Sequence, residues 1–366
     1  MVKTIYVSKI MSDEEIADKE GEHFDESHYN TILDEDADVY TKEGKLLLKL
    51  RKGAIPKNIT DLALESYRNA AKKTHENRGA AAGELDRNKM NKYIGEFVNQ
   101  GKFRTKFISN TSGIQSKQAT SNLSPSNIIG FYDRPDRNLL GKGPPCRLTA
   151  YNRDYPDLWE KSVPFITHID KLFKKLTPEA HAKQLKKCQA VPDFAIGDTA
   201  YSTVTINYSW RTALHKDAGD FMDGFGNLIV IEDTDNPNTY KGAYTGFPQY
   251  GVAANVRTGD FLAMDVHEWH SNTEFKKDKK DIKLDNSDRK VKNDWHYNRL
   301  SIVCYLRDQM IRCKHLSNNT PDSTQNGGAI VKSINKKSKL EMIRQKILDT
   351  FPPDLVNILR DNDLFD

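Results

Sequence analysis

Four segments rich in β-branched and apolar residues, in a fixed order with polar motifs between them, most constrain the fold of this chain. Each has the length and residue content of a strand. A turn at residues 257–260 precedes the third segment, and the fourth carries an arginine near its start. The segments are residues 203–208, 227–231, 261–265 and 298–306. This order predicts a mainly β chain with flanking helices (α+β), with a double-stranded β-helix core of the jelly-roll, cupin-like type and with N- and C-terminal helical elements packed outside it.

A metal-ligand pattern lies between these segments. The motif His215-Lys216-Asp217 follows the first segment, and His270 comes 53 residues after Asp217, just beyond the third. Residues i and i+2 of a strand project to the same side, so His215 and Asp217 can bind one ion. Two histidines and one carboxylate hold Fe(II) in non-haem oxygenases and leave positions open for a cosubstrate and dioxygen. We therefore expect His215, Asp217 and His270 to be the metal-binding, catalytic residues.

Each ligand also has an ordinary explanation. An H-x-D pair occurs by chance in many chains, and a single histidine is more often a surface or core residue than a ligand. His267 competes with His270 for the second histidine position. If His270 binds the metal, His267 becomes a substrate-side residue or only a strand residue.

Arg299 has a definite role if an iron site is present. A dicarboxylate such as 2-oxoglutarate chelates iron through its 2-oxo acid end, and its far carboxylate then needs a cation deeper in the barrel. The planar guanidinium of arginine matches a carboxylate with two parallel hydrogen bonds. The alternative is an ordinary arginine at a strand edge, but the residues that follow Arg299 are almost wholly apolar.

Five short motifs lie in or beside these strands. They are Thr205-Ile206-Asn207-Tyr208, His215-x-Asp217, Gly259-Asp260-Phe261-Leu262, His270-Ser271-Asn272-Thr273 and Arg299-Leu300-Ser301-Ile302-Val303. Together they resemble the TET/JBP family of 2-oxoglutarate- and Fe(II)-dependent nucleic-acid dioxygenases. The resemblance covers about residues 200–307; residues 77–83 and 146–149 are similar to the JBP-like branch more loosely.

The resemblance implies hydroxylation of the 5-methyl group of a pyrimidine in DNA, either thymine or 5-methylcytosine. It implies Fe(II), 2-oxoglutarate and O2 as cofactors, with succinate and carbon dioxide as coproducts. His215, Asp217 and His270 match the family's iron ligands, and Arg299 matches its 2-oxoglutarate arginine; we also assign Asn207 and Tyr208 to the cofactor side. The chain lacks a cysteine-rich zinc region like that of animal TET enzymes and an obvious J-base-binding domain, which leaves the substrate base open.

A base inside a duplex cannot reach such an iron, so we expect a flipped base or single-stranded DNA. The pocket then needs aromatic stacking partners and polar groups for the base edge. Asp220 lies three residues after Asp217 and has an equally good explanation as a turn residue. The substrate-binding candidates are Asp220, Trp210, Phe225, His267, Trp269, Arg78, Lys276 and Lys277, with Asn207 and Tyr208 as further candidates.

Charge changes sign along the first third of the chain, although the net charge is only +4. Residues 11–40 are strongly acidic, and residues 41–120 are basic. Lys102, Arg104, Lys106 and Lys117 could track a phosphate backbone, or they could form an ordinary solvated face. A second basic run at 276–292 has no strand or helix periodicity, so we read it as an inserted loop that either contacts DNA or is a passive hairpin.

These patterns divide the chain into four parts: an acidic leader at 1–40, a basic helical and mixed part at 41–199, a dioxygenase core at 200–310 with the insert 276–292, and a C-terminal helical extension at 311–366. We expect residues 60–100 to be mostly helix, 127–132 to be a strand and 156–187 to be two helices, with Pro178 able to begin the second.

Composition bounds the remaining possibilities. A chain of 366 residues with 37% hydrophobic residues can bury a large core. It has no apolar run long enough for a membrane span, and we expect no secretory leader. Four cysteines without C-x-x-C spacing predict free thiols in a reducing intracellular compartment, cytoplasm or nucleus, with a viral or phage origin plausible. We expect a monomer.

Three alternatives from other classes stay open. The same residues would serve a 2-oxoglutarate oxygenase that acts on protein or a small metabolite. A catalytically inactive barrel could bind modified DNA. A cupin-like metal protein could use another cosubstrate, such as ascorbate.

Overall fold

The computed structural model describes residues 2–68, 70, 75, 77–87, 95–116, 119–133, 146–232, 240–277 and 299–313. Most of the predicted insert 276–292, the whole C-terminal extension beyond residue 313, and Lys117 lie outside these ranges. Within them, none of the helices has both the length and the apolar content that a bilayer crossing requires.

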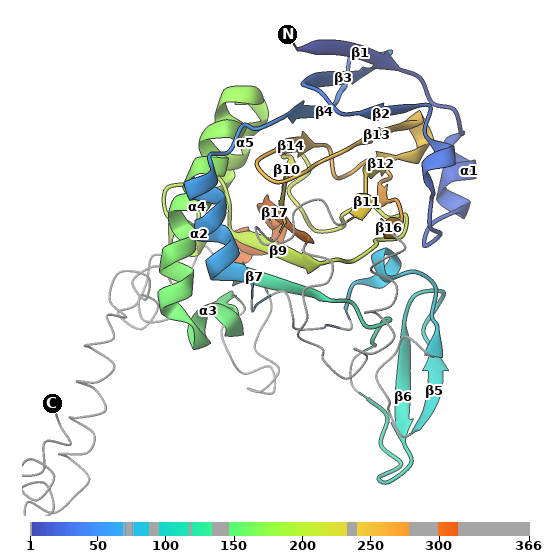
Figure 1. Cartoon of the computed structure of the whole chain (residues 1–366). Helices are drawn as coiled ribbons and strands as arrows, with labels where there is room; N and C mark the ends of the chain where they lie inside the picture. Colours follow the sequence, from blue (N-terminus) through green and yellow to red (C-terminus); the bar gives the residue numbers. More distant parts are fainter. Residues whose placement is uncertain are drawn as a thin grey trace, which may run out of the picture.

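A nine-stranded sheet forms one wall of the molecule (Figure 1). Its central strands, β10, β17 and β9, run antiparallel, with Ser301 of β17 opposite Val230 on one side and Asn207 on the other. The sequence predicted these three segments to be strands from their β-branched residues. In spatial order the sheet contains β1 (Lys3–Val7), β3 (Ala37–Thr41), β4 (Leu46–Arg51), β14 (Phe261–Met264), β10 (Gly226–Glu232), β17 (Arg299–Tyr305), β9 (Thr203–Tyr208), β7 (Ser126–Tyr132) and β8 (Arg147–Leu148).

A four-stranded sheet forms the opposite wall and completes the predicted double-stranded β-helix. Its order is β15 (Ser271–Asn272), β12 (Thr245–Phe247), β13 (Val252–Ala254) and β2 (Thr31–Leu33). A short pair, β11 (Tyr240–Gly242) with β16 (Phe275–Lys277), lies beside it. Apolar side chains from both walls, including Leu228, Val252 and Leu262, fill one part of the interior.

Helices cover the outer face of the large sheet (Figure 1). The longest two are α4 (Pro156–Leu176) and α5 (Pro178–Gln189), and each begins with a proline at its first turn, as expected from the sequence. Alternation along the strands turns Ile302 and Cys304 toward the helices, where they join a core with Phe165, Ile169 and Phe173 of α4. The other helices are α1 (Asp13–Asp18), α2 (Lys57–Tyr67), α3 (Ala150–Asp154) and the short 3-10 turns η1 (Glu26–His28), η3 (Gly79–Ala82), η6 (Pro192–Phe194), η7 (Pro248–Tyr250) and η8 (Asp308–Cys313).

Two expectations about the N-terminal half were wrong. The described residues of 60–100 are not mostly helical: α2 ends at Tyr67, and residues 95–109 form the hairpin of β5 (Gly95–Asn99) and β6 (Thr105–Ser109). The acidic segment 1–40 is not a separate leader, because it supplies β1 and β3 to the large sheet and β2 to the small one. The error on residues 1–40 comes from strand pairing with distant segments, which local composition does not report; β5 and β6 form a local hairpin whose strands the composition did not identify.

The prediction of four free thiols was also wrong. Cys146 and Cys313 form a disulfide across 167 residues of sequence, with their Cα atoms 6.1 Å apart. This bond joins η8, just after β17, to the segment that enters β8. Cys188 and Cys304 are free and buried. A pairing over this separation has no spacing signature in the sequence.

Candidate metal centre and substrate cavity

Two extended segments bring the predicted metal ligands together. The backbone N–H of His215 donates to the carbonyl of His270, and the N–H of His270 donates back, each at 3.0 Å. The N–H of Asp217 donates to the carbonyl of Val266, also at 3.0 Å. These paired hydrogen bonds hold all three ligand residues on fixed backbone, although their sequence positions are up to 55 residues apart.

The ligand atoms of His215, Asp217 and His270 all lie within 4.8 Å of one another. The Nε2 atoms of His215 and His270 are 3.5 Å and 3.9 Å from the nearer carboxylate oxygens of Asp217. The Nδ1 atom of His215 lies 2.8 Å from the carbonyl of Ala213, and that of His270 lies 2.9 Å from the carbonyl of Glu268. A carbonyl can only accept, so each Nδ1 carries the proton and each Nε2 presents a lone pair to a metal ion.

The pKa values of these groups favour the metal-binding forms. Burial raises the pKa of Asp217, but its interactions with His215 and His270 outweigh the effect of burial and lower the pKa to about 2. Burial, followed by the neighbouring His215, lowers the pKa of His270 to about 4. Both groups are therefore deprotonated at neutral pH, which is the state that binds a cation.

A cavity of about 620 Å³ opens over this triad. Its walls are the inward faces of β9 and β17, because residues two apart on a strand share a face. Thr205 and Asn207 come from β9, and Ser301, Val303 and Tyr305 from β17. The volume lies within the usual range for a small-molecule site, about 300–1,000 Å³.

Arg299 lies on the same face of β17 as Ser301 and Val303. It is two residues before Ser301, at the start of the strand. Its side chain is fully buried, and its Nε and Nη2 atoms have no hydrogen-bond partner among the described residues. Burial lowers its pKa, and the nearby Tyr240 and Glu232 partly offset that effect. A buried guanidinium with two unsatisfied donors is costly by itself, and a bound carboxylate would satisfy it.

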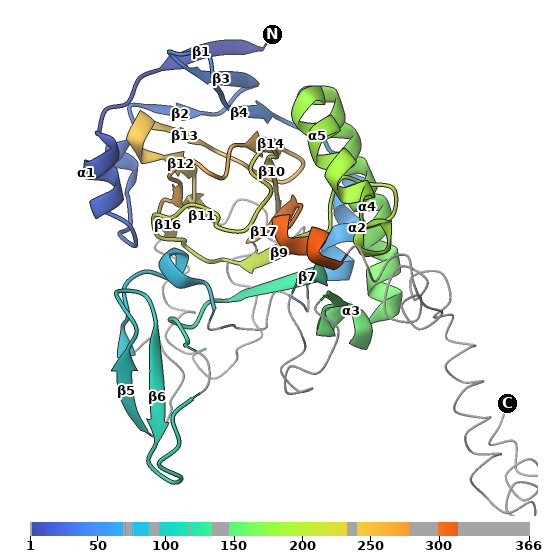
Figure 2. The same ribbon diagram turned by 180° about the vertical axis from the view of Figure 1, so that it is seen from behind.

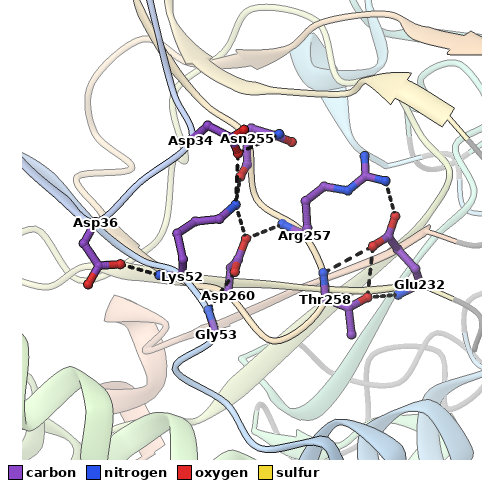
Figure 3. A network of polar contacts seen from close by, with 9 residues as sticks. All are labelled: Asp34, Asp36, Lys52, Gly53, Glu232, Asn255, Arg257, Thr258 and Asp260. Atoms are coloured by element: carbon purple, nitrogen blue, oxygen red, sulfur yellow. Dashed lines mark hydrogen bonds and ion pairs between the residues drawn. The ribbon is translucent and has the colours of Figure 1, made fainter. Parts of the chain in front are cut away.

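A polar network supports the strand opposite Arg299 (Figure 3). Glu232 of β10 is the backbone partner of Arg299, and its carboxylate pairs with Arg257 at 2.5 Å and accepts from the Thr258 hydroxyl at 3.1 Å. Asp260 accepts from the N–H of Arg257 at 2.8 Å and pairs with Lys52 at 2.6 Å. The predicted turn 257–260 is thereby fixed to both neighbouring strands.

Four of the predicted substrate residues line the cavity: Asn207, Trp210, Asp220 and Arg78. The Nε and Nη2 atoms of Arg78 have no partner in the described part of the chain. Burial, followed by the charge of Asp217, raises the pKa of Asp220 well above its usual value. The Asn207 side chain accepts a hydrogen bond from Ser126 at 2.6 Å, which fixes its orientation.

The other candidates are not brought to the cavity. Tyr208 and Phe225 pack against the core under the helices; Tyr208 points away because it is one residue from Asn207 on the same strand. His267 contacts the carbonyl of Phe221 at 3.2 Å, and Lys216 covers the ring of Trp269. Lys276 pairs with Glu26 on the outside of the barrel, and Lys277 ends β16.

Sequence reasoning missed several cavity residues. Arg307 holds Asp133 at 2.7 Å and stacks over Tyr132, and both Arg307 and Tyr132 line the cavity. Ser121 reaches it from the N-terminal half, and so does Arg104, which the sequence suggested only as a contact to the phosphate backbone. Arg307 lies two residues beyond the end of β17 at Tyr305, so its position was a usable signal. The other three residues, Tyr132, Arg104 and Ser121, reach the cavity through long-range folding.

A jelly-roll barrel with a His-Asp-His triad at the base of its cavity defines the class of non-haem Fe(II) oxygenases. Residues 128–308 match the model of the TET/JBP family, described as the oxygenase domain of the 2OGFeDO superfamily. Residues 128–308 belong to this family of 2-oxoglutarate- and Fe(II)-dependent dioxygenases, as the motifs of the sequence predicted.

Individual relatives agree with this assignment. The chain is 32% identical over 197 residues to the bifunctional helicase and thymine dioxygenase JBP2 of Leishmania infantum, covering 52% of this chain and 16% of that protein. It is 33% identical over 183 residues to the thymine dioxygenase JBP1-B of Trypanosoma cruzi, covering 50% and 19%. It therefore spans less than a fifth of the length of these relatives.

One solved structure, NgTET1 in complex with 5mC DNA, aligns over 82% of this chain and 92% of that chain, with a TM-score of 0.41 and 11% identity.

Proposed function

We propose that this chain hydroxylates the 5-methyl group of a pyrimidine base in DNA, using Fe(II), 2-oxoglutarate and O2. The observation that carries the proposal is the triad of His215, Asp217 and His270 at the base of a cavity whose barrel also buries the unsatisfied Arg299. In this proposal the triad holds Fe(II), and Arg299 binds the far carboxylate of 2-oxoglutarate.

The residues present fit both groups. Each Nε2 offers a lone pair, because the Nδ1 proton is already used by a backbone carbonyl. Asp217 supplies the one carboxylate of a facial triad. Arg299 supplies two unused donors for a dicarboxylate, in a region from which water is excluded. When bound, Fe(II) with its cosubstrate supplies the oxidising power for replacing a methyl hydrogen by a hydroxyl group.

The chain's own residues then hold the base. A nucleotide must leave the helical stack, or be single-stranded, to enter a cavity that lies inside the barrel. Trp210 offers a flat surface for stacking, and Asn207 and Asp220 offer polar atoms for the base edge. Arg78 carries a positive charge suited to a phosphate or a carbonyl oxygen.

Thymine is the first base to test, and 5-methylcytosine is the second. The curated relatives that match half of this chain are named thymine dioxygenases. Asn207 can donate and accept, so this residue alone does not discriminate between the two bases.

The proposal is tested by measuring succinate release with and without DNA. Fe(II)-loaded protein is expected to release succinate slowly with 2-oxoglutarate alone, and at least about tenfold faster when DNA is added, because a bound substrate commits the enzyme to turnover. Equal rates with and without DNA would favour a protein or small-molecule substrate. Tight DNA binding without any succinate would favour a catalytically inactive barrel.

A further inference from the structure

A β-arm projects from the barrel (Figures 1 and 2), and Arg104 at its base lines the cavity. It consists of β5, β6 and the returning segment up to Thr120. β5 and β6 pair antiparallel from Gly95 opposite Ser109 to Asn99 opposite Thr105. The returning segment pairs with β6 through Thr105 with Thr120 and Ile108 with Gln115. The arm therefore has one end at residues 100–105, its root, and a far end at residues 109–115, its tip.

The root of the arm is fixed to the segment that carries a metal ligand. The ring of Phe103 lies so close to Gly21 that a Cβ atom there would come within 2.2 Å of Cε1. The N–H of Gly21 donates to the carbonyl of Leu214 at 2.9 Å, next to His215. Lys102 pairs with Glu84 at 2.9 Å and donates to the carbonyl of Glu20 at 3.1 Å. These contacts set the direction of the arm relative to the metal centre.

A row of positive charge leads from the cavity along the arm. Arg104 lines the cavity and is exposed. Lys106, two residues farther along the chain, lies in β6 and is half-buried. Neither Arg104 nor Lys106 forms an ion pair within the described ranges. The only acidic residue of the described arm, residues 95–116, is Glu96.

The tip combines hydroxyl and amide side chains with one large apolar residue. Residues 109–112 are Ser, Asn, Thr and Ser, groups that commonly contact phosphate and sugar oxygens. Ile114 is 69% exposed. These hydroxyl and amide groups, together with the positive charge of Arg104 and Lys106, complement a polyanion.

We infer that the arm lies along duplex DNA on one side of the target nucleotide and contacts its phosphates. This inference rests on the proposed function, because it takes the cavity as the position of the flipped base. At about 3.4 Å per residue, the five residues of β6 span about 17 Å. Each base-pair step advances about 3.4 Å, so the arm can follow about five base pairs. DNA contact is therefore unequal on the two sides of the target.

The test compares the affinity for duplexes that are shortened on one side of a single thymine or 5-methylcytosine. The full chain, loaded with Fe(II) and 2-oxoglutarate without oxygen, is titrated by fluorescence anisotropy. Shortening the flank from about ten to two base pairs on the arm side is expected to weaken binding about tenfold or more, and the same cut on the other side much less. Equal losses on both sides, or none, would overturn the inference.

The Lys106→Ala variant tests how much the arm, as distinct from the rest of the surface, contributes to DNA binding. Loss of one phosphate contact should make the slope of log K against log salt shallower by about 0.9 and weaken duplex binding. Lys171→Ala, an exposed lysine of α4 on the helical side of the barrel, is the matched control and should change neither quantity. An unchanged slope in Lys106→Ala would remove the arm from the interface.

A single-stranded oligonucleotide distinguishes this inference from the proposed function. Oxidation of the single strand by the unaltered chain tests the chemistry at the cavity in the absence of a flanking duplex for the arm to contact. If the unaltered chain oxidises no DNA, the proposed function fails. The affinities for duplexes shortened on one side still test whether the arm contacts DNA. If DNA is oxidised but both flanks count equally, only the arm inference fails.

Discussion

Replacing Asp217 with alanine is expected to lower oxidation of DNA by more than about 100-fold. Loss of a group that merely orients a metal ligand already costs about 10- to 100-fold in metal affinity or activity, and Asp217 is the only carboxylate of the triad. Two neutral imidazoles alone hold Fe(II) weakly. The variant should therefore also lose bound iron, measured as metal content after anaerobic desalting, together with succinate release.

Asp223→Ala is the control for this prediction. Asp223 lies in the same connection, is 60% exposed and forms a surface pair with Lys183 at 3.5 Å. Such pairs contribute little, about 0–1 kcal/mol, so iron content and rate should stay at the unaltered level. An Asp217→Ala protein that keeps full iron content and turnover would show that the metal binds elsewhere.

Replacing Arg299 with alanine is expected to weaken 2-oxoglutarate binding by about 30-fold or more. Truncating one partner of a buried, hydrogen-bonded charge pair costs about 2–5 kcal/mol, and each 1.4 kcal/mol is about a factor of ten. Arg299→Lys keeps the charge but loses the planar pair of donors, so it should recover only part of the affinity. The measurement is anaerobic calorimetric titration of Fe(II)-loaded protein with 2-oxoglutarate.

Because Arg299 is fully buried, thermal unfolding of each variant must accompany the titration. Arg153→Ala, at an exposed arginine of α3, provides the control and should leave the affinity unchanged. A folded Arg299→Ala protein that binds 2-oxoglutarate as tightly as the unaltered chain would assign the far carboxylate to another cation.

The barrel core and the order of its ligands could be predicted from the sequence because these signals are local. The runs of β-branched residues in β9, β10 and β17 predict strands by themselves. The H-x-D spacing places His215 and Asp217 on one side of an extended segment. His270 was identified by its position after the turn 257–260 and the strand that follows. The structure places it in the triad, and places His267 against Phe221 instead.

The surroundings of the site could be predicted less well because they depend on long-range pairing. Strands β1, β2 and β3 join the two sheets from a segment whose composition resembled a leader. The β-arm is a local hairpin, but it lies in a segment whose composition resembled a helix. The disulfide joins residues from opposite ends of the core. One error was avoidable: strict alternation on β9 means that Asn207 and Tyr208 cannot both face the cavity, and the buried position of Val204 and Ile206 under the helices already favoured Asn207.

The most direct test of the central claim is mass spectrometry of nucleosides from DNA treated with the chain. Protein loaded with Fe(II) without oxygen is given 2-oxoglutarate and air, on DNA that contains thymine and 5-methylcytosine, beside a His215→Ala control. A nucleoside heavier by one oxygen atom, absent from the control, is the predicted result, and its identity names the base. Unmodified nucleosides in a sample that forms succinate at the full rate would contradict methyl oxidation in DNA.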